Sequence, residues 1–483
     1  MNTKRILFLK AISVFCLTMI SLFFSLSTIA QSDSKYKIVA IATGNKHCIA
    51  LRSDGTVWAW GNNEHGQLGN GTTTKSNKPV QVKGLSNVIA IAGGENHSVA
   101  LKKDGTVWAW GIKECLGNNI NNDSKFPVQV KYVKNIISIA AGFSNSIAVQ
   151  KDGTVWTWGD NMYLQLGKED YDGYLPLQVK GLNNVKQAAC GLGFCIVVKM
   201  DGTVWAWGWN KNTHFCVDAS DINDETFANP RKVQKISNIK EVYGSSYILA
   251  LKNNGLVFRW GDGGFPEVVK GVGDVKSINE GYAHSLAVKG DGTVWAWGLN
   301  DQGQLGNGNA VKKSFPPMQV NGLSNMISIA AGEGYSVALG GNGTVWAWGA
   351  NDKGQLGDGT FTNKNKPVKV EFNLITNTTN LNTQNTVITD IPNWKHPVKE
   401  ELLKYGYDPY KVEFIKNNKY PIFYVDNNGG ASIYDTDFLK SIAQKNSYWD
   451  FKIIDGKKSV EVYCDKQKRK IIKTISDIET KIY

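Results

Sequence analysis

A histidine that recurs at one spacing is a candidate general base or metal ligand, and this chain has three such residues. His47, His97 and His284 each stand three residues after a glycine and one residue before a Cys or Ser. Four further copies of the same segment hold Asn, Phe or Tyr in this position, and Phe can neither transfer a proton nor ligate a metal. We therefore expect the three histidines to be structural. The remaining histidines show no ligand spacing, so no metal site is predicted.

Cysteines are the second set of residues that could do chemistry, and the chain has seven. Cys190 and Cys195 flank a four-residue turn and could face each other across a hairpin, either as a disulfide or as two free thiols. Cys48 and Cys195 occupy a position that four other copies fill with Ser, which indicates a small buried side chain. No Cys-x-x-Cys pair suggests metal or redox chemistry. Unpaired thiols are expected at Cys115, Cys216 and Cys464.

Local motifs of enzymes are missing from the sequence. It contains no Gly-x-Ser-x-Gly elbow, no Gly-x-x-x-x-Gly-Lys phosphate loop and no His-Glu-x-x-His segment. Residues 426–429 faintly resemble a calcium loop but lack its later ligands, so we interpret them as a turn. The sequence therefore predicts a protein that is not an enzyme and that uses no cofactor.

The elements that position these residues come from an internal repeat. The segment Asp-Gly-Thr-Val-Trp-Ala-Trp-Gly at 54–61 occurs seven times with small changes, at intervals of about 48 residues. An Asp-Gly pair is typical of a hairpin turn, because Gly accepts the positive φ that the turn needs. The copies begin at Asp54, Asp104, Asp152, Asp201, Asn254, Asp291 and Asn342. The Gly-x-x-His segment precedes each copy and opens at Gly44, Gly94, Gly142, Gly191, Gly244, Gly281 and Gly332.

Each repeat is expected to form four short strands. In the third strand the two Trp positions are two residues apart, so their rings share one face of the sheet and the small residues share the other. Thirteen of these fourteen positions hold Trp, and the exception is Phe258. Such rings could bind sugars or bases, but their presence in every repeat favours packing between sheets. Seven four-stranded units predict an all-β fold, a seven-bladed β-propeller spanning residues 36–372.

Three motifs together resemble the regulator of chromosome condensation repeat. They are Gly-x-x-His-Ser-x-Ala-Leu, Asp-Gly-x-Val-Trp-x-Trp-Gly and Asn-x-x-Gly-Gln-Leu-Gly-x-Gly. The third motif is intact at 62–71, 300–308 and 351–359, degenerate in three other repeats and essentially deleted after Gly261. The resemblance implies a seven-bladed propeller, in agreement with the count of repeats.

The resemblance implies more than one function. In the best-known members the propeller catalyses guanine-nucleotide exchange on the small GTPase Ran, through an inserted β-hairpin and charged residues on one face. No interval between repeats exceeds 53 residues here, which leaves no room for such an insertion. Secreted bacterial propellers with similar repeats include a β-lactamase-inhibitory protein. We favour a non-enzymatic protein-binding scaffold of the inhibitor or adhesin type. The alternatives are a guanine-nucleotide exchange factor for a small GTPase and a glycan or cell-wall binding module.

The first thirty residues are typical of a secretory signal peptide. Lys4, Arg5 and Lys10 precede an apolar run at 11–26, and small residues at Thr28 and Ala30 suit cleavage after Ala30. An uncleaved membrane anchor is the alternative, although the apolar run is short for a bilayer span. We expect a secreted or periplasmic protein with no membrane span after cleavage.

The composition changes after the repeats. Residues 373–393 are rich in Asn and Thr and are interpreted as a linker. Residues 394–483 are rich in Lys, Tyr and Ile and are expected to form a small α+β domain of unknown function. Helices are predicted near 398–404 and 436–445. Strands are predicted near 421–425, 449–454, 460–464 and 470–474.

The formal net charge is +12, but the basic excess is spread over the whole chain. Such a distribution favours a solvated surface over a nucleic-acid groove, so no nucleic-acid partner is predicted. We expect a monomer whose partner is another protein.

A contact surface can be placed by the order of strands in a blade. The turn after the first strand and the loop between the third and fourth strands lie at one end of the propeller, and the uniform Asp-Gly turns lie at the other. Variation is greatest in the loops after Gly159 and Gly208, where aromatic residues gather. The sequence predicts a contact patch there, although these rings could instead cover the outer edges of the blades. The residues are Tyr163, Tyr171, Tyr174, Trp209 and Phe215.

Overall fold

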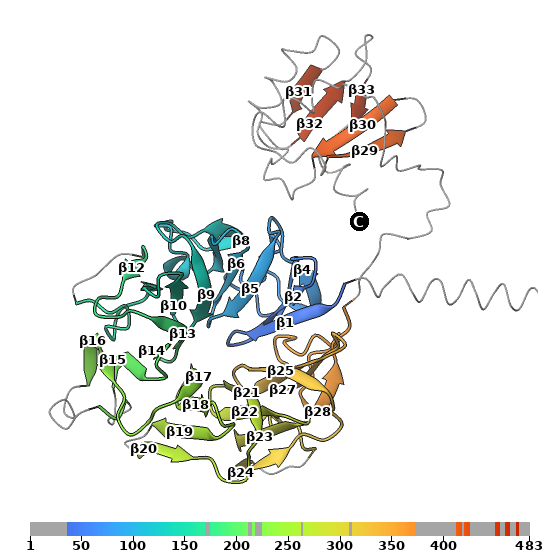
Figure 1. The fold of residues 1–483 in the computed structure, drawn as a ribbon. Helices are drawn as coiled ribbons and strands as arrows, with labels where there is room; N and C mark the ends of the chain where they lie inside the picture. Colours follow the sequence, from blue (N-terminus) through green and yellow to red (C-terminus); the bar gives the residue numbers. More distant parts are fainter. Residues whose placement is uncertain are drawn as a thin grey trace, which may run out of the picture. The chain divides into compact units, whose positions relative to one another are not determined.

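Seven four-stranded antiparallel sheets follow one another along the chain in the computed structural model (Figure 1). The structure describes residues 36–169, 174–210, 215–217, 225–261, 264–308 and 312–372, and the backbone of five later strands. Each sheet takes its strands in chain order, so each blade is one continuous segment. The predicted seven-bladed propeller is confirmed.

The blades have nearly uniform strand lengths. Blades 1 and 2 contain β1 (Ile38–Thr43), β2 (His47–Arg52), β3 (Val57–Gly61), β4 (Ser76–Gln81), β5 (Val88–Gly93), β6 (His97–Lys102), β7 (Val107–Gly111) and β8 (Ser124–Gln129). Blades 3 and 4 contain β9 (Ile136–Ala141), β10 (Asn145–Gln150), β11 (Val155–Gly159), β12 (Leu177–Gln178), β13 (Val185–Cys190), β14 (Phe194–Lys199), β15 (Val204–Trp209) and β16 (Thr226–Lys232). Blades 5 and 6 contain β17 (Ile239–Gly244), β18 (Ile248–Lys252), β19 (Val257–Gly261), β20 (Gly264–Val268), β21 (Val275–Glu280), β22 (His284–Lys289), β23 (Val294–Leu299) and β24 (Lys313–Gln319). Blade 7 contains β25 (Met326–Ala331), β26 (Tyr335–Gly340), β27 (Val345–Gly349) and β28 (Lys364–Lys369).

The Asp-Gly pairs form the turns between the second and third strands. Asp54 Oδ1 accepts hydrogen bonds from the Thr56 N–H at 3.1 Å and from the Thr56 hydroxyl at 2.7 Å. Gly55 has φ +80°, and an added Cβ would lie 3.1 Å from the backbone of Asn87 in the next blade. The motif therefore supplies both the turn geometry and the close approach of two blades.

The Trp rings pack between blades, as predicted. Trp110 of blade 2 is fully buried and packs with Val57 and Ala59 on the facing side of blade 1. The first Trp of each pair, such as Trp108, is only half-buried. Large rings on one face and small residues on the other thus let successive sheets stack.

The ring closes without exchange of strands between the first and last blades. All four strands of blade 1 come from residues 38–81, and all four strands of blade 7 come from residues 326–369. The contact is made by side chains instead. The Tyr335 hydroxyl of blade 7 lies 2.6 Å from the His47 carbonyl oxygen, and Trp60 Nε1 donates to the Gln355 carbonyl at 2.9 Å.

A second compact unit begins after residue 374. Its described strands form one sheet from β29 (Val412–Asn417) and β30 (Tyr420–Val425), and another from β31 (Asp450–Ile454), β32 (Ser459–Tyr463) and β33 (Lys470–Ile472). β30 to β33 lie where strands were predicted, whereas β29 was not predicted. The predicted helices, the linker and the signal peptide lie outside the described residues. Within the part that the structure does describe, no helix is long and apolar enough to cross a bilayer.

Candidate functional site

The three sequence motifs meet at the junctions between blades. The Gln67 carbonyl of blade 1 accepts hydrogen bonds from Trp110 Nε1 and from the Ser98 hydroxyl of blade 2, both at 2.8 Å. His47 Nε2 lies 2.9 Å from the Ser98 hydroxyl oxygen. Because that hydroxyl gives its only hydrogen to Gln67, the imidazole must donate from Nε2. We call this set of bonds, which joins the His47, Ser98 and Trp110 side chains and the Gln67 backbone carbonyl across two blades, the latch.

The histidines are therefore structural, as predicted. His97 contacts Ser146 at 2.8 Å and His284 contacts Ser336 at 2.9 Å through the same nitrogen. Burial, with a smaller contribution from the nearby His97, lowers the pKa of His47 to about 3. An imidazole that stays neutral and does not reach the surface can hold two blades together but cannot act as a general base. The Gly of the motif is needed because a Cβ at Gly44 would collide with the His47 ring.

At the junction of blades 3 and 4, Asn145 and Cys195 replace the His and Ser of the latch, whereas Trp207 Nε1 still donates to the Gln165 carbonyl at 2.9 Å. Cys190 and Cys195 are direct partners across β13 and β14, and their Sγ atoms are 2.9 Å apart. A disulfide would hold these atoms at about 2.05 Å, so both thiols are free in this structure. Asn145 Nδ2 donates to both sulfurs, at 3.3 Å and 3.0 Å. Burial raises the pKa of Cys190 well above its usual value. A thiol in this state is a poor nucleophile.

Two of the residues predicted for the contact patch lie together. The rings of Tyr163 and Trp209 stack at 4.8 Å between centroids, with 20° between their planes. The Tyr163 ring covers Gly193, where an added Cβ would lie 2.6 Å from it. The loop of blade 3 and the Gly-x-x-Phe turn of blade 4 therefore share one end of the propeller. Both rings are half-buried, which leaves part of the stacked pair open to solvent.

The other three residues predicted for the contact patch do not join the stacked pair in the described structure. The placement of Phe215 on the surface is wrong, because its side chain is fully buried and packs against Phe194 at 5.6 Å. Its N–H donates to Asn210 Oδ1 at 2.8 Å, the bond that Leu68 makes with Asn63 in an intact third motif. Phe215 thus fills the position of the motif's buried Leu. Tyr174 is half-buried, and Tyr171 lies outside the described residues.

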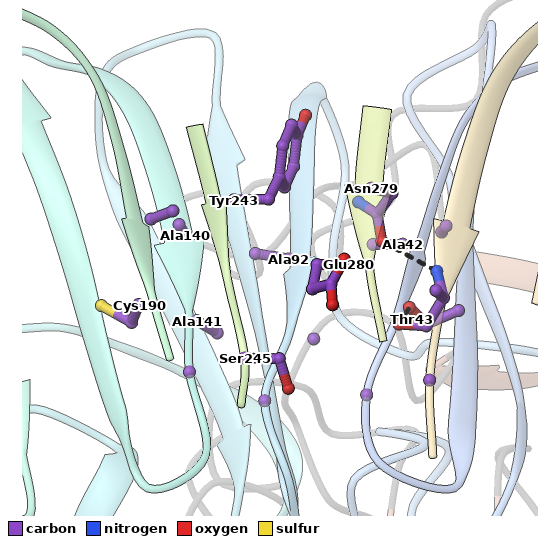
Figure 2. Close-up of a pocket in the computed structure, with 18 of the residues that line it drawn as sticks. Ala42, Thr43, Ala92, Ala140, Ala141, Cys190, Tyr243, Ser245, Asn279 and Glu280 are labelled. Carbon is purple, nitrogen blue, oxygen red and sulfur yellow. Dashed lines mark hydrogen bonds between the residues drawn. The ribbon is translucent and has the colours of Figure 1, made fainter. Parts of the chain in front are cut away.

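A pocket of about 380 Å³ occupies the channel along the axis of the propeller. The first strands of all seven blades line it, mostly with small side chains such as Ala42, Ala92 and Ala140 (Figure 2). Blades 5 and 6 differ, because Tyr243, Asn279 and Glu280 stand in these positions. The sequence analysis did not single out these residues. Comparison of the aligned positions between repeats would have revealed them as departures from small residues.

The end of the channel nearest the Gly-x-x-His turns is acidic and partly aromatic. Glu95, Glu333 and Tyr282 line the pocket there. Burial and the charge of Glu333 raise the pKa of Glu95, and Glu333 itself pairs with Lys46 at 3.6 Å. No group of three His, Cys, Asp or Glu residues that could hold a metal ion occurs in the described ranges. The pocket therefore offers acceptors and rings for a cationic group.

Comparison with protein families agrees with the repeat analysis. The RCC1-like domain matches residues 25–271. The regulator of chromosome condensation (RCC1) repeat matches 291–339 and 342–376, and a second description of the same repeat matches 275–304 and 326–355. The matches therefore extend through the whole propeller.

Individual relatives share only part of their length with this chain. E3 ubiquitin-protein ligase HERC2 of Homo sapiens is 37% identical over 140 residues, which are 26% of this chain and 3% of the ligase. Protein RCC2 homolog of Danio rerio is 40% identical over 94 residues, 19% of each chain. The crystal structure of human WBSCR16 aligns with a TM-score of 0.59 at 19% identity, covering 66% of this chain and 94% of that chain. At this identity the likeness shows the fold alone. Since the RCC1-like domain covers half of the sequence and the repeats continue beyond it, the chain belongs to the family of proteins built from regulator of chromosome condensation (RCC1) repeats.

Proposed function

We propose that this protein is an exported, non-enzymatic scaffold that binds another protein through the end of the propeller that carries the Gly-x-x-His turns. The charged and apolar start of the chain supports export. The stacked pair of Tyr163 and Trp209 is the observation that carries the choice of surface. Loops at the opposite end are nearly identical Asp-Gly turns, which give a partner little to distinguish.

The stacked pair has the properties of a binding anchor. Tyr and Trp provide large contact areas, and they lose little side-chain entropy when they are already held in place. Tyr163 is held from below by Gly193 and from the side by Trp209, with 4.8 Å between the two ring centroids. A partner that covers the open parts of both rings would bury them without first ordering them.

Membership of the family makes guanine-nucleotide exchange the second candidate. The intervals between the repeats argue against it, because none is long enough for an inserted hairpin. Export would also separate the protein from a cytosolic GTPase. A glycan or cell-wall ligand is the third candidate, since exposed rings also bind sugars. The ligase activity in the name of HERC2 is not transferred, because the match covers 3% of that protein.

Capture of partners from the secreted proteins of the source organism tests the proposal. The bait is the chain from residue 31 onward, beside Tyr163→Ala and Trp209→Ala variants. We expect one protein to bind the parent, and each substitution to weaken binding by about 1–2 kcal/mol or more. Tyr132→Ala is the matched control, because Tyr132 is 69% exposed and follows a fourth strand, at the end with the Asp-Gly turns.

Each result has a distinct meaning. A secreted hydrolase as the captured partner supports the inhibitor function, whereas a small GTPase or peptidoglycan would replace it with one of the other two candidates. If both patch variants bind like the parent while Tyr132→Ala does not, the contact surface lies at the opposite end. Melting temperatures of all variants should stay close to that of the parent.

A further inference from the structure

Within the described ranges, the junction between blades 5 and 6 lacks the backbone hydrogen bond that joins the turns at the other junctions. At six junctions a backbone N–H in the Gly-x-x-His turn donates to a carbonyl in the turn of the next blade, as Asn45 does to Gly94 at 3.2 Å. Blade 5 has a turn one residue shorter, because Gly244 pairs directly with Ile248 in the sheet. Its Ser245 N–H bonds within the turn, to the Tyr247 carbonyl at 3.0 Å. Among the described residues, no such bond joins blade 5 to blade 6.

The latch is also incomplete at this junction. The third motif is deleted after Gly261, so no Gln carbonyl faces blade 6. Trp297 Nε1, which is equivalent to Trp110 Nε1, has no partner within the described part of the chain, although Trp297 is only 2% exposed. Arg259 stands where other repeats place a buried Ala or Thr, and its guanidinium lies 3.6 Å from the centre of the Tyr247 ring. The deletion of the third motif in blade 5 thus leaves Trp297 Nε1 without its usual partner, and the shorter turn of blade 5 removes the bond to the turn of blade 6.

Glu280 is the polar group of this junction that reaches the channel. Its position in the sheet corresponds to Thr43, Gly93, Ala141, Cys190, Gly244 and Ala331 in the other blades. The side chain is 7% exposed, and neither carboxyl oxygen has a hydrogen-bond partner in the described residues. Figure 2 shows the carboxyl group among the residues that line the pocket. A buried carboxyl group without a hydrogen-bond partner is unfavourable, so it calls for a ligand.

The surroundings select the chemistry of that ligand. Glu95 and Glu333 at the mouth of the pocket attract cations and repel anions. A metal ion does not fit, because the described residues contain no group of three ligating side chains. Tyr243 and Tyr282 add aromatic rings to the same pocket, and such rings attract organic cations. An ammonium group is small and carries three N–H donors, which suits a single buried carboxylate whose oxygens have no other hydrogen-bond partner within the described part of the chain.

We propose that the channel binds a protonated primary amine, whose ammonium group donates a hydrogen bond to the Glu280 carboxylate. The amine belongs either to a free alkylamine or to a lysine side chain of a bound protein. Burial raises the pKa of Glu280 to about 8, against the opposing effects of the Ser285 hydroxyl and, more weakly, the Arg259 charge. The carboxyl group is therefore mostly protonated at neutral pH, and it releases its proton to solvent when the ammonium group binds. The site does not involve Tyr163 or Trp209, so it can exist whether or not the proposed contact surface is correct.

Calorimetric titration of the full chain with n-butylamine tests the proposal. We expect saturable binding and, from runs in two buffers with different ionisation enthalpies, release of about one proton for each amine bound. Glu280→Gln should weaken binding about tenfold or more, because a charged hydrogen bond is lost. Gln has the shape of the protonated carboxyl group, so this variant should fold like the parent. Glu241→Gln is the matched control, because Glu241 lies in the neighbouring strand β17 but does not line the pocket.

Two further ligands distinguish a free alkylamine from a lysine side chain as the source of the amine. If N-acetyl-lysinamide binds like n-butylamine and its ε-acetylated form does not, a lysine side chain fits the site. If only the free alkylamine binds, the ligand is a small amine. Absence of saturable binding of n-butylamine to the parent would overturn the proposal. Unchanged binding to Glu280→Gln, or equally tight binding of tetramethylammonium, which has no N–H donor, would also overturn it.

Discussion

The latch makes a quantitative prediction, because one Trp forms it fully and another does not. Trp110 and Trp297 hold equivalent positions and are both buried. Trp110 Nε1 donates to the Gln67 carbonyl at 2.8 Å, whereas Trp297 Nε1 has no partner among the described residues. Replacement of either Trp by Phe removes the same atoms and leaves a ring in place. The two variants therefore lose similar packing and differ in the hydrogen bond.

The expected difference follows from these contacts. In Trp110→Phe the protein loses one buried hydrogen bond, worth about 1 kcal/mol, while Ser98 still satisfies the Gln67 carbonyl. In Trp297→Phe a buried donor without a partner is removed, which relieves a cost of about 1–3 kcal/mol. We expect Trp110→Phe to be less stable than Trp297→Phe by about 2–4 kcal/mol.

Urea titrations of both variants, followed by far-UV circular dichroism, measure this difference as free energies of unfolding. The parent provides the reference for each variant. If the two substitutions cost the same, the hydrogen bond contributes nothing beyond packing. If Trp297→Phe were the more damaging, the assignment of the incomplete latch to blades 5 and 6 would be wrong.

Three further predictions concern pH, oxidation and processing. Burial lowers the pKa of His97 to about 3, below the value of about 6.5 in the unfolded chain, so its stabilising effect is complete above pH 6.5 and is lost as the pH falls towards 3. Between pH 7.5 and 5 the parent should therefore lose about 2 kcal/mol more stability in urea titrations than His97→Asn, and parallel curves would contradict this. Mild oxidation should leave Cys190 and Cys195 as free thiols, because burial raises the pKa of Cys190; a mass lower by two hydrogens that is abolished in Cys195→Ser would contradict this. N-terminal analysis of exported protein should begin at Gln31, and soluble cytosolic protein that still begins at Met1 would refute export.

The parts of the fold that the repeats present many times could be predicted from the sequence. Seven copies of the Trp segment fixed the strand, the faces of its rings and the number of blades. The structural role of the histidines followed because one position tolerated both His47 and Phe194. Comparison of equivalent positions between the repeats thus distinguishes residues that serve packing from residues that could serve catalysis or binding.

Comparison of repeats could not predict features that arise because another segment of the chain has lost its usual motif. Phe215 was assigned to the surface because the motif around it had decayed, although Asn210 preserves the bond that turns the segment inward. Glu280 stands in a ring of small side chains without a hydrogen-bond partner among the described residues. Beside it, a deletion after Gly261 leaves the latch incomplete, and a shortened turn at Ser245 removes the bond between the turns. Both changes lie in the preceding blade, so no reading of the segment around Glu280 alone would identify it.

Continuous blades also determine how the ring responds to force. Because no strand of blade 1 completes the sheet of blade 7, tension on the two ends of the propeller acts on the side-chain contacts at that junction, such as Tyr335 to His47, before it acts on any sheet. Once these contacts yield, the ring opens and the load passes to one terminal blade. Each blade then unravels alone and releases about 48 residues, or about 160–170 Å of extended chain. The protein would lengthen in seven steps of similar size, and the blades not yet unfolded would stay folded at each step.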